Sequence, residues 1–323
     1  MVSSQVALVP KPAPEELAER EGQPLVVICG PTATGKTAAA VELAERIGGE
    51  IIAADSRTIY KEMDIGTAKP TPALQARVKH HLIDIARPDE VVTVATYRRL
   101  ALAAMGEIRT RGRVVLLVGG TGLYIRAITD GLSIPEVAPD WSLRERLEQL
   151  ERDAPGTLYS RLQAVDPISA SRIHPRNVRR LIRALEVYEH TGRPISELQR
   201  TANLAGPVVM VGLTAERAEL HHRIEVRVDV QIEAGLVEEV RRLLDAGYAR
   251  DLPAMQGLGY KEIIAYIDGR ISLEEAIRLV KRNTRRFAKR QLTWFRRDSR
   301  IRWLTGTGLA PEEVAQRIQA MLH

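Results

Sequence analysis

The stretch of sequence that decides the fold is GPTATGKT, which comprises Gly30, Pro31, Thr32, Ala33, Thr34, Gly35, Lys36 and Thr37. An apolar run, PLVVIC (24–29), precedes it and is typical of a buried parallel strand, and an Ala-rich segment (38–47) with helical periodicity follows it. A strand, Gly-x-x-x-x-Gly-Lys-Thr and a helix in this order are typical of a phosphate-binding loop. Glycine permits the tight turn, and the backbone amides with the N-terminal end of the helix hold phosphate oxygens. The stretch therefore predicts that a diphosphate or triphosphate binds here.

Two side chains of the loop add chemistry to this anion site. Lys36 brings a mobile positive charge to the phosphates, and the hydroxyl of Thr37 is placed to bind Mg²⁺. The alternative is a glycine-rich turn that only caps a helix, and the Lys-Thr pair together with both flanking elements argues against it.

Further apolar runs predict the rest of the sheet. Strands are expected at residues 50–54, 81–85, 113–118 and 207–213, with a helix at 94–111. Strands that alternate with helices predict an α/β fold, with a P-loop NTPase-like parallel sheet flanked by helices. After residue 131 the strand character is lost, and charged helical segments continue to residue 199. This change predicts a mostly helical inserted domain.

The chain is therefore expected to have three parts. Residues 1–23 contain three prolines and no apolar core region, so we interpret them as a mobile leader and not as a secretory signal. Residues 24–130 and 200–323 are expected to form the P-loop α/β core with a basic C-terminal helix, and residues 131–199 the helical insertion domain.

Composition limits the class of protein. The 323 residues are 45% hydrophobic and 27% charged, as is ordinary for a soluble globular protein. The single cysteine, Cys29, excludes an internal disulfide and a thiolate zinc site, and it suits a cytoplasmic location. No apolar run approaches the roughly 18 to 20 residues that a membrane-spanning helix needs, so no contact with a membrane is expected.

The positive charge of the chain is concentrated near its C-terminal end. Between Lys281 and Arg302 there are ten Lys or Arg residues and one acid, Asp298, whereas the whole chain has a net charge of +6. A long helix is expected from Ser272 to about Arg297, and its basic residues recur at three- and four-residue steps. This pattern predicts a continuous cationic stripe that binds a polyanion; the alternative is an ordinary solvated helix face.

A carboxylate and a glycine pair follow two of the expected strands. Asp55 comes after the strand at 50–54, at the edge where ligands bind in parallel sheets, and it could act as a general base or bind Mg²⁺ through a water. Its alternative role is to cap the next turn. Gly119 and Gly120 end the strand at 113–118 and predict a close approach of the backbone to a ligand, beside the polar Thr121.

Three other features fit contact with a nucleic acid. Arg176, Arg180 and Arg183 are expected to share one helix face, although an exposed helix with ordinary charges is equally compatible with the sequence. The loop around Gln256 combines glycines with a tyrosine and permits close approach to a nucleic-acid backbone or a flipped base. Trp294 could stack on a base, and the adjacent Phe295 is more consistent with the core.

With these segments in view, the chain resembles the tRNA dimethylallyltransferases, also called tRNA isopentenylpyrophosphate transferases, from about Leu25 to Arg297. The segments that carry the resemblance, in family order and spacing, are GPTATGKT (30–37), DSRTIYKEMDIGTAKP (55–70), GGTGLY (119–124), HPRNVRRLIRALEV (174–187), QGLGYKE (256–262) and KRQLTWFRRD (289–298). The tracts MDIGTAKP and KRQLTWFR are far more specific than the phosphate loop.

The resemblance implies transfer of a dimethylallyl group from dimethylallyl diphosphate to N6 of the adenine 3′ of the anticodon, position 37 of tRNA. The products would be N6-isopentenyladenosine and diphosphate, so the loop at 30–37 would hold the diphosphate of an isoprenoid. Lys36 and the loop amides would stabilise that leaving group. Mg²⁺ would bind to Thr37, either alone or together with Asp55 through a bridging water. Asp55 would be the general base, and the catalytic arginine of the family would fall in the segment from Arg223 to Arg227, with Arg227 favoured.

The resemblance also implies partners and tRNA-binding residues. The partners would be the anticodon stem-loop of tRNA and dimethylallyl diphosphate, with the protein acting as a monomer. Many family members have Gln where this chain has Thr58, which leaves base recognition at that position open. The tRNA-binding residues carried over are Asp55, Ser56, Arg57, Thr58, Thr121, Arg144, Asn177, Val178, Arg179, Arg180, Leu181, Gln256, Gly257, Leu258, Gly259, Tyr260, Lys261, Lys289, Arg290, Gln291, Leu292, Thr293, Trp294, Phe295 and Arg296.

Three alternative activities stay open at this point. A small-molecule kinase would use the same loop for ATP, and a nucleic-acid-dependent NTPase would hydrolyse it. A transferase that prenylates free adenine nucleotides would have no use for an extended cationic surface, which argues against that alternative.

Overall fold

The computed structural model describes residues 23–199 and 206–322. The predicted mobile leader, residues 1–23, lies outside the described residues apart from Gln23. The described residues contain one six-stranded sheet with the order β3-β2-β4-β1-β5-β6, in which every neighbouring pair is parallel. Its strands are β1 (Leu25–Cys29), β2 (Gly49–Ala53), β3 (His80–His81), β4 (Val114–Gly119), β5 (Val208–Thr214) and β6 (Ile301–Thr305).

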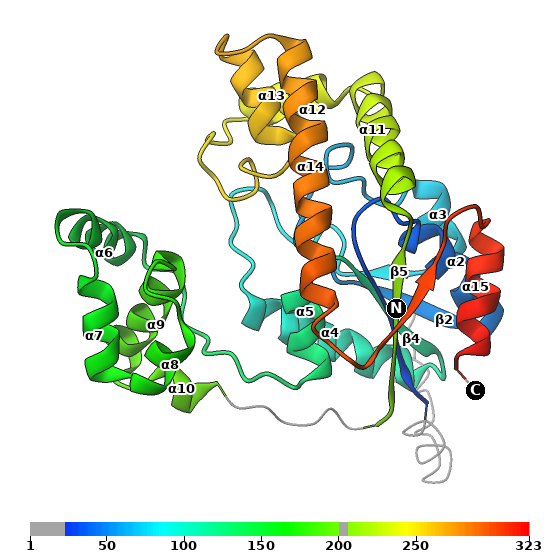
Figure 1. Cartoon of the computed structure of the whole chain (residues 1–323). Coiled ribbons are helices and arrows are strands. Elements are labelled where there is room, and N and C mark those ends of the chain that lie inside the picture. The colour runs from blue at the N-terminus through cyan, green and yellow to red at the C-terminus, as the bar shows by residue number, and fades with distance from the viewer. Residues whose placement is uncertain (1–22, 200–205, 323) are drawn as a thin grey trace, which may run out of the picture.

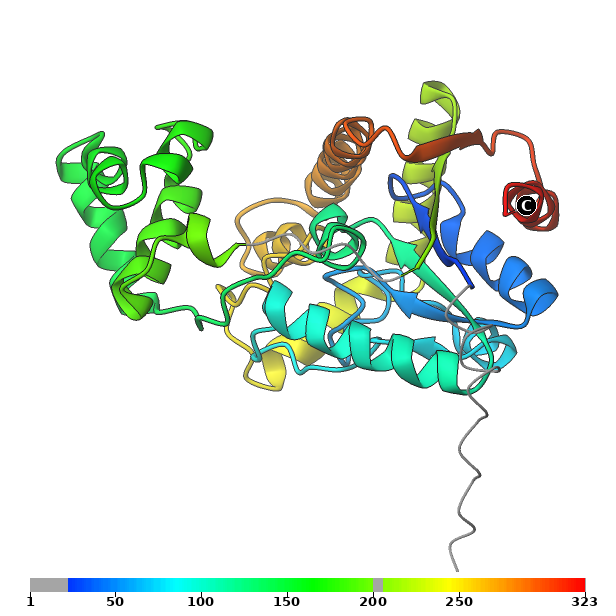
Figure 2. The ribbon, with the colours of Figure 1, turned by 90° about the horizontal axis from the view of Figure 1, so that it is seen from below.

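Helices cover both faces of the sheet (Figures 1 and 2). On one face, α2 (Lys36–Ile47) and α15 (Pro311–Ala320) share a hydrophobic core with β1, β4 and β5, and α3 (Pro72–Arg77) packs at its margin. On the other face, α4 (Val94–Thr110) and α5 (Gly122–Thr129) form a second core with the same strands. The predicted α/β class and the parallel sheet with flanking helices are therefore confirmed.

A layer of four helices stands over the carboxyl edge of the sheet (Figure 1). It contains α11 (Arg217–Glu233), α12 (Leu236–Asp245), α13 (Tyr260–Ile267) and the long α14 (Leu273–Phe295). These helices enclose a third core with the loop that follows β2, which contributes Ile59 and Met63. The last turn of α14 returns to the sheet, because Phe295 is buried in the core beneath α5.

The segment between β4 and β5 carries a separate group of helices to one side of the sheet (Figures 1 and 2). These helices are α6 (Trp141–Asp153), α7 (Thr157–Val165), α8 (Pro167–Arg172), α9 (Val178–Thr191) and α10 (Ile195–Leu198). They bury a hydrophobic cluster of their own, which includes Leu158, Leu162 and Leu181. This separate core supports the expected boundaries of the helical insertion domain, residues 131–199, which remain a proposal.

Several local expectations need correction. The strand expected at 81–85 is only the two-residue β3, because Leu82 and Asp84 have φ angles of 62° and 56° that turn the chain away from the sheet. Arg176 precedes α9, so it does not share a helix face with Arg180 and Arg183. Five further elements were not predicted from the sequence: α3, α5, β6, α15 and α13 (Tyr260–Ile267), whose first residues were expected in a loop.

Candidate active site

One cavity of about 500 Å³ lies at the carboxyl edge of the sheet. Lys36 and Thr37 line it from the phosphate loop, Asp55 from the end of β2, Thr121 from the end of β4 and Arg227 from α11. These strands are parallel and end at the same edge, which is why residues far apart in the sequence meet there. The structure thus brings all four predicted catalytic residues, including Asp55 and Lys36, to a single cavity.

The phosphate loop owes its shape to left-handed backbone positions. Gly30 has a φ of 131°, Ala33 of 64° and Gly35 of 83°. A Cβ atom on Gly30 would lie 2.3 Å from the carbonyl oxygen of Leu213, so only glycine fits beside β5. The loop then leads directly into α2, whose free N-terminal amides face the cavity side of the sheet.

Charge in the cavity is strongly positive. Asp55 is the one carboxylate among the described residues that line it, and the Lys and Arg residues that line it are Lys36, Arg57, Arg179, Arg227, Lys261 and Arg290. Burial lowers the pKa of Lys36 to about 8, against the opposing effect of the Asp55 charge. Burial also lowers the pKa of Arg227, again opposed by Asp55. A multiply charged anion bound in the cavity would stabilise the charged forms of these buried cations.

Asp55 is held at the rim by its own turn. Its Oδ1 accepts a hydrogen bond from the Arg57 N–H at 2.9 Å, and Oδ2 forms no hydrogen bond with any described residue. Thr121 fixes the neighbouring backbone, since its Oγ1 accepts from the Ser56 N–H at 3.0 Å and its own N–H donates to the Ala54 carbonyl at 3.0 Å. The carboxylate is therefore oriented, with one oxygen left to accept a proton.

Of the arginines on α11, Arg227 is the one that faces the phosphate loop. Its Nη1 donates to Thr32 Oγ1 at 3.3 Å. Arg223 instead pairs with Glu219 at 2.7 Å, one turn earlier on the same helix, and does not line the cavity. The choice of Arg227 as the candidate catalytic arginine stays a prediction, and the geometry supports it.

The predicted tRNA-binding residues divide into two groups. The cavity is lined by Asp55, Ser56, Arg57, Thr58, Thr121, Arg179, Gln256, Leu258, Gly259, Tyr260, Lys261, Arg290 and Gln291. The residues that lie outside its lining are Arg144, Asn177, Val178, Arg180, Leu181, Gly257, Lys289, Leu292, Thr293, Trp294, Phe295 and Arg296. Arg179 is the residue that α9 contributes, so the inserted helices reach the site at that point.

Some residues of both groups have structural partners that limit contact with tRNA. Leu181 and Phe295 are buried in cores. Arg144 forms two hydrogen bonds with the buried Glu186, at 2.7 and 2.8 Å, and packs over Trp141. Gln291 is 7% exposed, and its amide forms hydrogen bonds inside the protein. These contacts argue against a direct tRNA contact by Leu181, Phe295 or Gln291.

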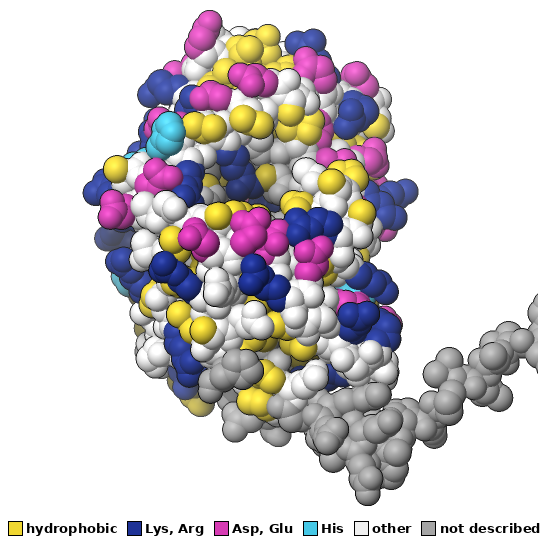
Figure 3. Space-filling model, turned by 90° about the vertical axis from the view of Figure 1, so that its right-hand side faces the viewer, with side chains coloured by type: hydrophobic (Ala, Val, Ile, Leu, Met, Phe, Trp, Pro, Cys, Tyr) yellow, Lys and Arg dark blue, Asp and Glu magenta, His cyan; other side chains and the backbone are white. Residues whose placement is uncertain are grey.

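The cationic stripe on α14 is interrupted by acids of α11. Lys281 pairs with Asp229 at 2.7 Å and Arg285 pairs with Glu225 at 2.5 Å. The expectation of a continuous unpaired stripe is therefore wrong, because the sequence of α14 does not show which acids a neighbouring helix supplies. Arg286, Lys289 and Arg290 are exposed and form no ion pair with any described residue. On the face of the molecule in Figure 3, basic and acidic side chains are interspersed.

The glycines after β4 accommodate side chains of α14. A Cβ atom on Gly120 would lie 2.3 Å from Gln291 Nε2, and one on Gly122 would lie 2.1 Å from Trp294 Nε1. Trp294 consequently packs against α5 and the core, which argues against the predicted stacking on a base. The expected close approach to a ligand concerned Gly119 and Gly120; both line the cavity, and a Cβ atom on Gly119 would lie 2.1 Å from the Ala54 carbonyl oxygen.

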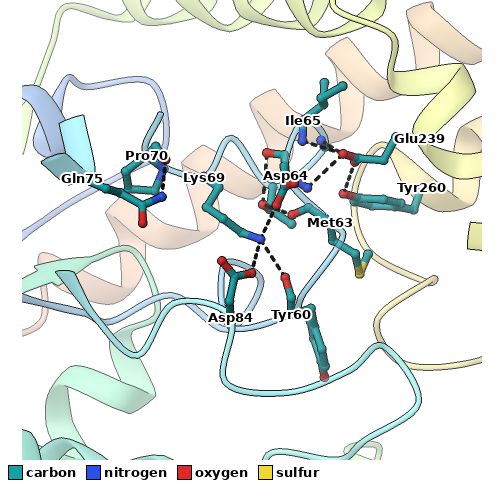
Figure 4. A network of polar contacts seen from close by, with 12 residues as sticks. Tyr60, Met63, Asp64, Ile65, Lys69, Pro70, Gln75, Asp84, Glu239 and Tyr260 are labelled. Carbon is teal, nitrogen blue, oxygen red and sulfur yellow. Dashed lines mark hydrogen bonds and ion pairs between the residues drawn. The ribbon is translucent and has the colours of Figure 1, made fainter. Parts of the chain in front are cut away.

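A buried polar network that sequence reasoning missed shapes the loop after β2 (Figure 4). Glu239 of α12 is 1% exposed and accepts hydrogen bonds from the N–H groups of Asp64, Ile65 and Gly66 and from the Tyr260 hydroxyl. The ammonium group of Lys69 bonds the Tyr60 carbonyl, Asp64 and Asp84.

This network places part of the cavity wall. Glu239 holds the loop at residues 64–66, and Lys69 holds it three residues further on. Gly66, Thr67 and Ala68 of this stretch line the cavity. A signal for Glu239 was present in the sequence, because an acid at this position lies on the apolar face of α12 with Leu236, Val240 and Leu243.

The fold and the cavity define a phosphate-loop α/β protein with a single carboxylate beside the anion site and an inserted helical segment. A family model described as IPP transferase matches residues 58–298, and the chain belongs to that family. The family resemblance seen in the sequence is therefore confirmed.

Individual relatives are similar over nearly the whole chain. A tRNA dimethylallyltransferase of Pelotomaculum thermopropionicum is 51% identical over 304 residues, which cover 93% of this chain and 97% of the relative. One of Thermotoga maritima is 47% identical over 298 residues, covering 92% and 97%. These matches run through both the core and the inserted segment.

Solved structures agree with the fold. The full-length tRNA isopentenylpyrophosphate transferase of Bacillus halodurans has a TM-score of 0.68 at 43% identity, covering 93% of this chain and 97% of that one. A eukaryotic dimethylallyltransferase described as acting on tRNA has a TM-score of 0.75 at 26% identity, covering 93% and 78%. Within the described residues, no helix has the length and apolar character needed to cross a membrane.

Proposed function

We propose that this protein transfers a dimethylallyl group from dimethylallyl diphosphate to N6 of adenine 37, 3′ of the anticodon in tRNA. The observation that carries the proposal is that the phosphate loop and Asp55 open into the same cavity. The family and the names of its similar members support the same activity. A cavity of about 500 Å³ is within the range of small-molecule sites, which is about 300 to 1,000 Å³.

On the donor side, the loop and two cations hold the diphosphate. Lys36 and Arg227 are both desolvated, so their charges act strongly on an anion that loses its bond to carbon. As the bond between C1 and the diphosphate oxygen breaks, negative charge grows on that oxygen, and these groups are already in place to stabilise it. The arrangement fits a leaving group and requires no transfer of phosphate.

On the acceptor side, Asp55 takes a proton. The adenine enters the cavity out of the base stack, since its N6 is otherwise inaccessible. N6 forms a bond to C1 of the donor, diphosphate departs, and one N6 proton passes to Oδ2 of Asp55, the oxygen without a hydrogen-bond partner among the described residues. A positioned general base contributes about 10² to 10⁴ in rate.

The residues present fit a magnesium ion bound mainly by its substrate. The Thr37 hydroxyl and the Asp55 carboxylate are oxygen donors in one cavity, while the described residues contain no group of three His, Cys, Asp or Glu that could hold a metal. Thr37 would hold the ion directly and Asp55 through a water, with the diphosphate as the remaining ligand. When bound, Mg²⁺ would neutralise part of the diphosphate charge.

The tRNA is proposed to bind between α14 and α9. Arg290 and Arg179 line the cavity from these two helices, and Arg286 and Lys289 extend the positive surface along α14. Phosphates of the anticodon stem-loop fit such a surface, whereas a free mononucleotide would not span it. We further propose that the protein works as a monomer in the cytoplasm.

The deciding experiment incubates the protein with unmodified tRNA, Mg²⁺ and dimethylallyl diphosphate labelled in the prenyl group. The expected result is label in tRNA at adenine 37, located by nuclease digestion and mass spectrometry. Parallel reactions replace the donor with γ-labelled ATP, or the tRNA with adenosine monophosphate. Label transferred only from ATP would support a kinase, nucleic-acid-stimulated ATP hydrolysis an NTPase, and prenylated mononucleotide a transferase for free nucleotides.

A further inference from the structure

The amide of Gln291 joins two of the loops that form the cavity. Its Oε1 accepts a hydrogen bond from the Thr32 N–H at 2.9 Å, and its Nε2 donates to the Gly120 carbonyl at 2.9 Å. The side chain belongs to α14 and is 7% exposed. A single buried side chain therefore bridges the phosphate loop and the loop after β4.

The amide of Gln291 occupies the space that a side chain at Gly120 would fill. Gln291 Nε2 lies 2.3 Å from where a Cβ atom of Gly120 would be, and the nearest atom of any other residue, the Gly30 carbonyl oxygen, is at 3.5 Å. The Gly120 backbone is not left-handed, so an alanine there would not strain the backbone but would displace the amide of Gln291.

The bridge connects the donor side of the cavity to the acceptor side. At one end, Thr32 is also held through its hydroxyl by Arg227. At the other end, Gly120 adjoins Thr121, whose hydroxyl accepts from the N–H of Ser56, the residue next to Asp55. Gln291 thus belongs to a chain of contacts that runs from the phosphate loop to the backbone beside the candidate base.

We propose that Gln291 is a positioning residue for the transfer reaction, holding the phosphate loop in register with Asp55 and Thr121. The inference rests on the proposed function. Gln291 acts through Thr32 and Gly120, and the Thr32 N–H donates to Gln291 in this structure instead of pointing to the anion site as a free amide. Displacement of reacting groups by about 1 Å can lower a rate about 100-fold.

The first test replaces the amide by an apolar group of similar length, Gln291→Met. We expect kcat/KM for dimethylallyl diphosphate to fall about 10- to 100-fold and the affinity for inorganic diphosphate, titrated without tRNA, to fall about tenfold. The dissociation constant for tRNA, from gel shift, should change less than twofold. Gln316→Met, an exposed position on α15, is the matched control and should leave all three values unchanged.

A second variant reaches the same contact from the other side. Gly120→Ala places a methyl group where the Gln291 amide lies, so it should reproduce the loss of donor and diphosphate binding even if Gln291→Met folds poorly. The double variant should lose no more than about twofold beyond the more impaired single variant, because both changes remove one contact.

The outcomes distinguish a failure of the positioning role of Gln291 from a failure of the proposed transfer reaction. Multiplicative losses in the double variant, unchanged donor kinetics, or parallel losses of donor and tRNA affinity would overturn the positioning role. A wild-type protein that neither binds diphosphate nor prenylates tRNA would overturn the proposed function itself. A fully active wild type with unaffected variants would overturn only the role of Gln291.

Discussion

Lys36 and Asp55 face one cavity, where burial lowers the pKa of the lysine to about 8 and the carboxylate opposes that shift. The two side chains come from different strand–loop junctions, and they meet because β1 and β2 both end at the carboxyl edge of the sheet. Burial destabilises a charged side chain, so a buried lysine with a lowered pKa is costly to keep. Such a lysine beside an oriented carboxylate is common at functional sites.

Replacing Asp55 should separate catalysis from binding. Asp55→Ala removes the proposed proton acceptor, so prenyl transfer should fall by about 10² to 10⁴, while tRNA affinity stays within a few-fold of the wild type. Single-turnover transfer and gel-shift assays measure the two quantities. Asp245→Ala, at an exposed position at the end of α12, is the control. Full activity of Asp55→Ala would remove this residue from the mechanism.

The affinity for diphosphate should depend on pH through Lys36. Below about pH 8 the lysine is charged in the free protein, and above this value it loses its proton. Diphosphate favours the charged form, so binding above pH 8 should take up a proton and the affinity should fall up to about tenfold per pH unit. Calorimetric titration in buffers of different ionisation enthalpy detects that proton. A flat affinity between pH 7 and 9.5 would contradict the role of Lys36.

Lys36 should also reduce the stability of the free protein. Its pKa is lower when folded than when unfolded, so the unfolded state binds more protons between about pH 8 and 10.5, and stability should rise with pH across this interval. Lys36→Met should therefore increase the free energy of unfolding at pH 7 by about 1 to 3 kcal/mol while abolishing transfer. Urea denaturation at pH 7 and pH 10 measures both effects, and the gain should shrink at the higher pH.

Removing the unpaired cations of α14 should change how tRNA binding depends on salt. The triple variant Arg286→Gln, Lys289→Gln, Arg290→Gln should bind tRNA more weakly and reduce the slope of log K against log salt by about 2 to 3. The double variant Lys281→Gln, Arg285→Gln should alter the slope less, because these cations pair with Asp229 and Glu225. Equal slopes for the triple variant and the wild type would place the docking surface elsewhere.

Glu239 should be essential for the loop after β2. Glu239→Ala leaves three backbone N–H groups and the Tyr260 hydroxyl without their acceptor, so we expect a loss of about 3 to 5 kcal/mol in the free energy of unfolding. Amide hydrogen exchange should accelerate at residues 64–66. Glu238→Ala is the control, since its side chain is exposed on the same helix. Unchanged exchange at these amides would show that the loop holds its shape by other contacts.

The sequence was sufficient for the four central strands β2, β4, β1 and β5 and for the approximate location of the site. GPTATGKT and the apolar runs around it have a local pattern that identifies a phosphate loop, and Asp55 could be placed at the rim because parallel strands end at one edge. β6 was missed because it has five residues, two of them exposed, and follows a basic segment, whereas α15 carries visible signals in Pro311 and the apolar Val314 and Ile318.

Side-chain partners between distant elements could not be predicted. The pairing of Arg285 with Glu225 depends on how α11 packs on α14, which neither segment reveals alone. In the same way, Gln291 belongs to a tract that is basic in sequence, yet its side chain points into the protein. A single sequence indicates which face of a helix is apolar, but it does not show which polar residue of a mixed tract is turned inward.

The packing of Trp294 on Gly122 has a consequence for the geometry of catalysis. The indole fits where a methyl group would otherwise be, so the absence of one carbon atom determines how closely the last turn of α14 approaches α5. Of the exposed cations of that helix, Arg290 lines the cavity together with Asp55. The distance of this cationic helix from the carboxyl edge of the sheet therefore depends on a glycine.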